Sequence, residues 1–241
     1  SAQLRVLELE ANELEALPRT CEAHSDTLVA LLASFNRLGH VPALVQLHSG
    51  SLKKLHLGCN DIRTLVGSGL GELRNLAELC LEGNWLTALP DEVGRLKKLR
   101  ELWLHGNQLD ELPEALGDCE ALTVLQAHHN RLTRLPSSMR RLVRLQGLYL
   151  QSNRLRGSLT ELRQRILDAM PLQNLGLGAN QLDLAEAFAL ERVRIGLGWN
   201  LGRPPAHLET APLTERFSIT DHLYEPSSAG GRAPLLVVAF A

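Results

Sequence analysis

Residues 99–109, LRELWLHGNQL, follow the pattern L-x-x-L-x-L-x-x-N-x-L, and this pattern returns along the chain. Seven further copies are LRVLELEANEL (4–14), LVALLASFNRL (28–38), LKKLHLGCNDI (52–62), LAELCLEGNWL (76–86), LTVLQAHHNRL (122–132), LQGLYLQSNRL (145–155) and LQNLGLGANQL (172–182); a weaker ninth, RVRIGLGWNLG, covers 192–202. The asparagines are separated by 24, 24, 24, 23, 23, 23, 27 and 20 residues. Such a period is typical of a solenoid whose units stack on their neighbours.

Each part of the repeat has a physical role. The L-x-L segment predicts a short strand whose leucines point inward while the intervening side chain points outward. The asparagine can bond backbone groups at the bend after the strand, where they would otherwise be buried unpaired. A following L-x-x-L-P, as in LTALP, LDELP and LTRLP, predicts a restricted returning segment that closes the core from behind.

On these motifs the chain resembles the leucine-rich repeat family over roughly residues 4–202, with spacing like the intracellular, Ras-suppressor-like and plant Ras-group type. The resemblance implies an α/β fold: a curved solenoid of about nine repeats. Parallel strands would line the concave face, with turns and short helices on the convex face. Ligands of this family are most often held on the concave face.

The expected domain organisation follows the repeats. Residues 1–202 would form the solenoid, and 203–226 an irregular C-terminal cap. Residues 227–234, SSAGGRAP, are typical of a linker. Residues 235–241, LLVVAFA, are typical of a buried strand, so we expect either the first strand of a following domain or a terminal strand pairing with the last repeat.

The long 27-residue interval contains GSLTELRQRILDAM, residues 157–170. Ser158 and Glu161 form a capping-box pattern, and apolar residues recur at helical spacing after them. We therefore expect a true helix on the convex face at this repeat, in place of the looser turns elsewhere.

Outward positions of the middle strands carry the candidate partner-binding site. The expected contiguous patch has Glu82 and Glu101 on its N-terminal side and comprises Glu82, Glu101, Trp103, His105, Gln126, His128, Tyr149 and Gln151. Tryptophan and tyrosine beside hydrogen-bonding groups are typical of interaction hot spots. The alternative is a strand face that has no ligand.

A metal site is a second hypothesis for part of this patch. Glu82, His105 and His128 occupy the same position in successive repeats, and Glu-His-His is a possible zinc ligand set. Strands about 4.8 Å apart would place the outer two ligands nearly 10 Å apart, and nothing in the sequence orients the imidazoles. We therefore expect no metal and no cofactor.

Charged residues predict ladders between repeats. Glu111 should stack beside Arg134, and Asp118 between Arg95 and Arg141, because each pair is one repeat length of 23 residues apart. Six remaining arginines are a second candidate docking surface: Arg140, Arg144, Arg154, Arg156, Arg163 and Arg165.

Bulk properties restrict the function. A formal charge of −2 with 44% hydrophobic residues does not favour nucleic-acid binding, and no apolar run is long enough to span a membrane. Four scattered cysteines and the lack of an N-x-S/T acceptor favour a reducing compartment, the cytoplasm. We expect a non-catalytic module or scaffold that binds another protein in intracellular signalling; the alternative is the recognition arm of a larger enzyme.

Overall fold

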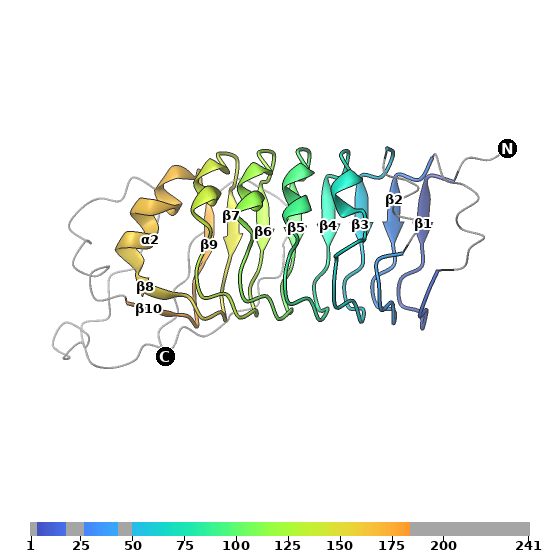
Figure 1. Ribbon diagram of the computed structural model, residues 1–241, viewed down its shortest axis with the longest axis horizontal. Helices are drawn as coiled ribbons and strands as arrows, with labels where there is room; N and C mark the ends of the chain where they lie inside the picture. The colour runs from blue at the N-terminus through green and yellow to red at the C-terminus, as the bar shows by residue number, and fades with distance from the viewer. Residues whose placement is uncertain (1–3, 18–26, 43–49, 184–241) are drawn as a thin grey trace, which may run out of the picture.

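Eight short strands form one parallel sheet along an elongated solenoid in the computed structural model, which describes residues 4–17, 27–42 and 50–183 (Figure 1). Their order in the sheet is β1, β2, β3, β4, β5, β6, β7 and β9. The strands are β1 (Val6–Glu8), β2 (Ala30–Leu32), β3 (Lys54–His56), β4 (Glu78–Cys80), β5 (Glu101–Trp103), β6 (Val124–Gln126), β7 (Gly147–Tyr149) and β9 (Asn174–Gly176). The sequence-based prediction of an α/β solenoid with in-register repeats is confirmed.

The register of the sheet places equivalent residues of successive repeats side by side. Leu79 pairs with Leu102, which pairs with Leu125, and the same row continues in both directions. Leu55, Leu79, Leu102, Leu125 and Leu148 are completely buried. One hydrophobic core therefore runs along the whole sheet, and each repeat contributes one layer of leucines to it.

An asparagine ladder holds the bend that follows each strand. The Asn107 amide donates hydrogen bonds to the carbonyls of Leu81 in the preceding repeat (2.8 Å) and Leu104 in its own (3.0 Å). Its Oδ1 accepts a hydrogen bond from the backbone N–H of Leu86 (3.0 Å). The predicted role of the asparagine is confirmed: it satisfies buried backbone groups of two repeats at once.

The residue before each asparagine lies in the left-handed backbone region. Positive φ angles occur here at Ala11, Phe35, Cys59, Gly83, Gly106, His129, Ser152 and Ala179. Only two of these eight residues are glycines, although a positive φ is unfavourable for other residues. The hydrogen bonds of the adjacent asparagine therefore hold the bend in a backbone conformation that is unfavourable for the six residues other than glycine.

Short 3₁₀ turns cover the other side of the core: η2 (Leu70–Glu72), η3 (Asp91–Arg95), η4 (Glu114–Asp118) and η5 (Ser137–Arg141). Prolines precede the last three turns, with φ between −73° and −65°, as the L-x-x-L-P motif predicts. Gly94 and Gly117 allow these turns to stack closely, because a Cβ there would lie 2.6 and 2.4 Å from the next turn's backbone oxygen.

The one α-helix of the described residues, α2 (Leu159–Arg165), lies at the C-terminal end of the ribbon (Figure 1). The Ser158 hydroxyl accepts hydrogen bonds from the backbone N–H groups of Thr160 and Glu161, so the predicted helix and its N-cap are confirmed. The 3₁₀ turn η6 (Leu167–Ala169) follows it, and β8 (Arg156–Ser158) pairs with β10 (Gln181–Asp183) in a second small sheet.

Several sequence-based predictions fall outside the described residues. These are the ninth repeat copy at 192–202, the cap at 203–226, the linker at 227–234 and the strand at 235–241. Within the described segments, the structure contains no helix with the length and apolar character needed to cross a bilayer.

Candidate interaction surface

The parallel sheet has one face toward the core and one face away from it. We call the outward side chains of the strands, together with the outward residue that follows each strand, the strand face. It corresponds to the concave face expected from the sequence. All eight candidate residues are on this face and all are half-buried rather than exposed. Trp103 and Tyr149 point outward as predicted but are partly covered, because neighbouring strands are close enough for their outward side chains to contact one another.

Trp103, Gln126 and Tyr149 form the central row of the strand face. Trp103 pairs with Gln126 and Gln126 with Tyr149 in the sheet register, so the three residues are direct neighbours. A Cβ on Gly147 would lie 3.2 Å from the Tyr149 ring, which shows that the ring lies over the backbone of its own strand. The row therefore combines two aromatic rings with an amide between them.

His105 and His128 come two residues after Trp103 and Gln126, just beyond the ends of β5 and β6, and their rings stack on each other. Their ring centroids are 4.4 Å apart and the ring planes differ by 7°. In-register strands produce this contact because equivalent side chains repeat at about the strand spacing of 4.8 Å. The expectation that nothing orients the two imidazoles was wrong. Burial lowers the pKa of His105, and the charge of His129 adds to this effect.

Carboxylates border the aromatic row on its N-terminal side. Glu78 accepts from Lys54 (2.8 Å) and lies 3.5 Å from His56 Nε2, while Glu101 pairs directly with Glu78 in the register. The Glu82 carboxylate lies over Gly58, where a Cβ would clash with it. Glu82 therefore leans toward the preceding repeat, and burial raises the pKa of its carboxyl.

Several polar atoms of the strand face are buried without a hydrogen-bond partner in the described part of the chain. They include Oε2 of Glu82, Nε1 of Trp103, Nδ1 of His105 and Oε1 of Gln151. Buried polar groups are nearly always hydrogen-bonded in folded proteins, and leaving one unpaired costs about 1–3 kcal/mol. These atoms are enclosed by neighbouring side chains, so they would reach a partner only after those side chains turn.

The geometry does not assemble the zinc ligand set considered above. Glu82 leans over Gly58, toward the repeat before it, whereas His105 and His128 stack on each other in the repeats after it. Among the described residues, no group of three or more His, Cys, Asp or Glu side chains is arranged to hold a metal ion. Cys80 faces the strand face but is 3% exposed, and burial raises the pKa of its thiol.

Ion pairs connect neighbouring repeats on the remaining surface. Arg134 pairs with Glu111 (3.2 Å) and Arg141 with Asp118 (2.8 Å), as predicted. The prediction that Arg95 also flanks Asp118 in an ion pair was wrong: Arg95 pairs with Glu72 (3.2 Å), one repeat earlier. Among the six arginines proposed as a second docking surface, Arg163 pairs with Asp168 (3.1 Å) and Arg156 donates to Gln181 (2.8 Å).

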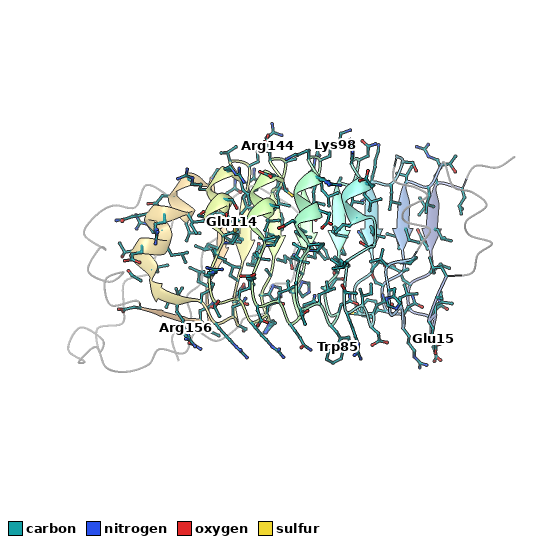
Figure 2. The ribbon with its side chains drawn as sticks, in the orientation of Figure 1. Glu15, Trp85, Lys98, Glu114, Arg144 and Arg156 are labelled. Carbon is teal, nitrogen blue, oxygen red and sulfur yellow. The ribbon has the colours of Figure 1, made fainter. Side chains whose placement is uncertain are left out.

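Two exposed aromatic residues were missed by the sequence analysis. Trp85 is 51% and Phe35 61% exposed, and each is adjacent to a ladder asparagine. Figure 2 shows Trp85 on the lower edge of the solenoid, with Glu15 and Arg156, whereas Lys98 and Arg144 lie on the upper edge. The position of Trp85 holds polar residues such as Asp61 and Arg131 in other repeats, whereas the position of Phe35 mostly holds small ones such as Ala11 and Ser152. These contrasts were the signal that could have identified the two aromatic residues.

Comparison with known proteins agrees with this architecture. The sequence profile of the family described as "Leucine rich repeat" matches residues 50–109 and 97–155. A search of curated proteins finds no match. The repeats and the solenoid that they build show that this chain has the leucine-rich repeat fold.

Solved structures similar to this chain include extracellular receptor domains. The leucine-rich repeat ectodomain of the Arabidopsis thaliana receptor kinase GASSHO1/SCHENGEN3, solved with CASPARIAN STRIP INTEGRITY FACTOR 2, has a TM-score of 0.63 at 29% identity and covers 74% of this chain. The Arabidopsis receptor kinase HAESA, solved with the peptide hormone IDA and the co-receptor SERK1, has a TM-score of 0.63 at 28% identity and also covers 74%. This chain spans 24% and 30% of those two chains.

A bacterial structure is also similar. A leucine-rich repeat protein of Leptospira interrogans has a TM-score of 0.57 at 25% identity, and the match covers 75% of this chain and 59% of that one. Plant and bacterial proteins thus share the arrangement of repeats seen here.

Proposed function

We propose that this protein is a non-catalytic interaction module that binds another protein on the strand face between β4 and β7. The observation that carries the proposal is the row of half-buried Trp103, Gln126 and Tyr149, next to the stacked rings of His105 and His128. Aromatic groups in a partly desolvated setting supply much of the binding free energy in protein interfaces. Since the surface is held by the ladder and the core, little ordering cost arises on this side of the complex.

Similarity to receptor ectodomains supports binding as the mode of action. Two of the similar solved structures contain a bound peptide or factor. An open face of strands offers no water-excluded pocket of the kind that catalysis needs. Binding, rather than chemistry, therefore suits this surface best.

The test is affinity purification from the cells that produce the protein, with the whole chain as bait. The double variant Trp103→Ala/Tyr149→Ala should lose the captured partner, whereas Trp85→Ala should retain it. Trp85 is a matched control because the same side-chain change is made at an exposed site on the edge of the solenoid. Circular dichroism would verify that all variants fold. Equal capture by the wild type and the folded double variant would exclude the strand face as the binding site.

We further propose that the module acts inside the cell, in signalling, as a Ras-suppressor-like type of leucine-rich repeat protein. The support is the 23-residue repeat spacing, the lack of an N-x-S/T acceptor, and three free thiols, Cys59, Cys80 and Cys119. Cell fractionation with an antibody against the protein tests this. Recovery in the secreted or cell-surface fraction would contradict it and would agree with the similarity to receptor ectodomains.

The alternative function is the recognition arm of a larger enzyme. Its support is that two similar solved structures come from receptor kinases. Immunoblotting of the native gene product for its size, followed by sequencing of any further domain, separates this alternative from a self-contained scaffold.

A further inference from the structure

Charge is unevenly distributed along the strand face. Strands β1 to β5 and the outward residues that follow them carry five glutamates and one lysine, a formal charge of −4: Glu8, Glu10, Lys54, Glu78, Glu82 and Glu101. The equivalent positions of β6, β7 and β9 carry no acid, lysine or arginine. The strand face is therefore acidic in its N-terminal half and neutral in its C-terminal half, and the border lies beside Trp103.

The acidic half is only partly neutralised by the protein itself. Lys54 is its one lysine and pairs with Glu78. Glu82 and Glu101 form no ion pair with any residue that the structure describes. Glu78 and Glu101 are direct neighbours in the sheet, and like charges placed opposite each other destabilise a sheet. The fold therefore bears a local electrostatic cost here that a cationic partner would relieve.

Three of these carboxylates gather around the floor of the strand face at Cys80. Cys80 pairs with Trp103 in the register. Burial raises the pKa of the Cys80 thiol, and the negative charges of Glu82, Glu78 and Glu101 raise it further. An aromatic ring next to carboxylates suits a guanidinium group, which can stack on the ring while its N–H groups donate to the carboxylate oxygens. Arginine fits this arrangement better than lysine, because its planar group makes both contacts together.

We infer that the partner presents an arginine-bearing segment to the N-terminal half of the strand face. This inference rests on the proposed function and specifies the partner's chemistry. Its guanidinium groups lie against Glu101 beside Trp103 and against Glu82 over Gly58, and its uncharged continuation crosses β6 and β7. There, the half-buried Gln126 and Tyr149 side chains meet an incoming backbone without opposing charge.

Fluorescence anisotropy with labelled synthetic peptides tests this inference on the whole chain. The probes are an alternating Arg-Gly octapeptide, the matching Lys-Gly peptide and the matching Glu-Gly peptide. We expect the arginine peptide to bind most tightly, and its affinity to fall about ten-fold between 50 and 300 mM NaCl because the contacts are ionic. If the arginine peptide binds no better than the glutamate peptide, the inference is overturned. If the lysine peptide binds as tightly as the arginine peptide, the preference for arginine is overturned.

Paired charge variants localise the effect. Glu82→Gln/Glu101→Gln should weaken binding of the arginine peptide about ten-fold, whereas Glu111→Gln/Glu120→Gln should change it less than about two-fold. Both variants remove two negative charges, but Glu111 and Glu120 are exposed residues outside the strand face. Equal weakening by both variants would show that only net charge matters and would overturn the inference.

The same variants separate this inference from the proposed function. If Trp103→Ala/Tyr149→Ala abolishes capture of the natural partner while Glu82→Gln/Glu101→Gln leaves capture unchanged, the strand face binds a partner that is not cationic. In that case the proposed function stands and the arginine-bearing partner is excluded. If neither variant affects capture, both proposals fail.

Discussion

Leu102 and Trp103 are neighbours in strand β5 but face opposite sides of the sheet. The core side looks the same in each repeat, with a buried leucine row and an asparagine ladder. The strand face changes from one repeat to the next, from Cys80 to Trp103, Gln126 and Tyr149. The difference shows that the repeated residues specify the fold, while the variable residues remain available to specify a partner.

The largest expected effect tests this division with two adjacent substitutions. Leu102→Ala should destabilise the protein by about 3–4 kcal/mol, because a completely buried leucine is lost and a cavity remains. Trp103→Ala should cost less, about 1–2 kcal/mol in stability, since its side chain is only half-buried on the strand face. Urea denaturation followed by circular dichroism measures both. Similar losses in the two variants would mean that the strand face is part of the structural core.

The second prediction compares two asparagines of the ladder. Asn107→Ala should destabilise the fold by about 2 kcal/mol, because it leaves the buried backbone N–H of Leu86 unpaired and removes one of the two donors to each of the Leu81 and Leu104 carbonyls. Asn12→Ala should cost less than about 0.5 kcal/mol, because the exposed Asn12 amide donates only to carbonyls of its own repeat, Leu9 and Glu10. Equal urea midpoints for the two variants would show that the asparagine hydrogen bonds between repeats do not contribute to the stability of the fold.

Features that follow from periodicity could be predicted from the sequence. The position of each strand, the inward leucines, the Glu111–Arg134 pair and the Ser158 cap all follow from residue spacing. The pairing of Arg95 did not, because Arg95 has an acid one repeat away on either side, Glu72 and Asp118, and spacing alone does not choose between them.

Residue spacing places the eight candidate residues on one face of the sheet but does not determine how they pack. Spacing places His105 beside His128 but does not say that their rings stack. Likewise, the direction in which Glu82 leans depends on the space left above Gly58, one repeat earlier. Such details depend on the side chains of neighbouring repeats, so they require the sheet register and the rotamers together.

A smaller expected effect concerns the contribution of His105 to the stability of the protein at low pH. Burial lowers the pKa of its imidazole, so the neutral form is favoured in the folded state. As the pH falls through the ordinary histidine range, the unfolded chain binds the proton first, and the folded state loses stability. His105→Gln should therefore lose less stability than the wild type between pH 7 and pH 5. An NMR titration in which His105 has a pKa at or above 6.5 would contradict this expectation.

The smallest expected effect has the opposite sign and concerns Glu82. Burial raises the pKa of this carboxyl, so the folded state holds its proton more tightly than the unfolded chain does. Stability from this group is present below the ordinary glutamate pKa and is lost as the pH rises through the folded value. Glu82→Gln should therefore stabilise the protein slightly at pH 7 and give no gain at pH 4.

Glu111→Gln is the matched control for this last variant, because Glu111 is exposed and paired with Arg134. It should give no gain in thermal stability at pH 7, since it removes a favourable ion pair rather than a desolvated charge. If Glu82→Gln is more stable and binds the arginine peptide more weakly, the carboxylate is kept at a cost to the fold and serves binding. If the variant is instead less stable at pH 7, Glu82 belongs with the repeated structural residues despite its place on the strand face.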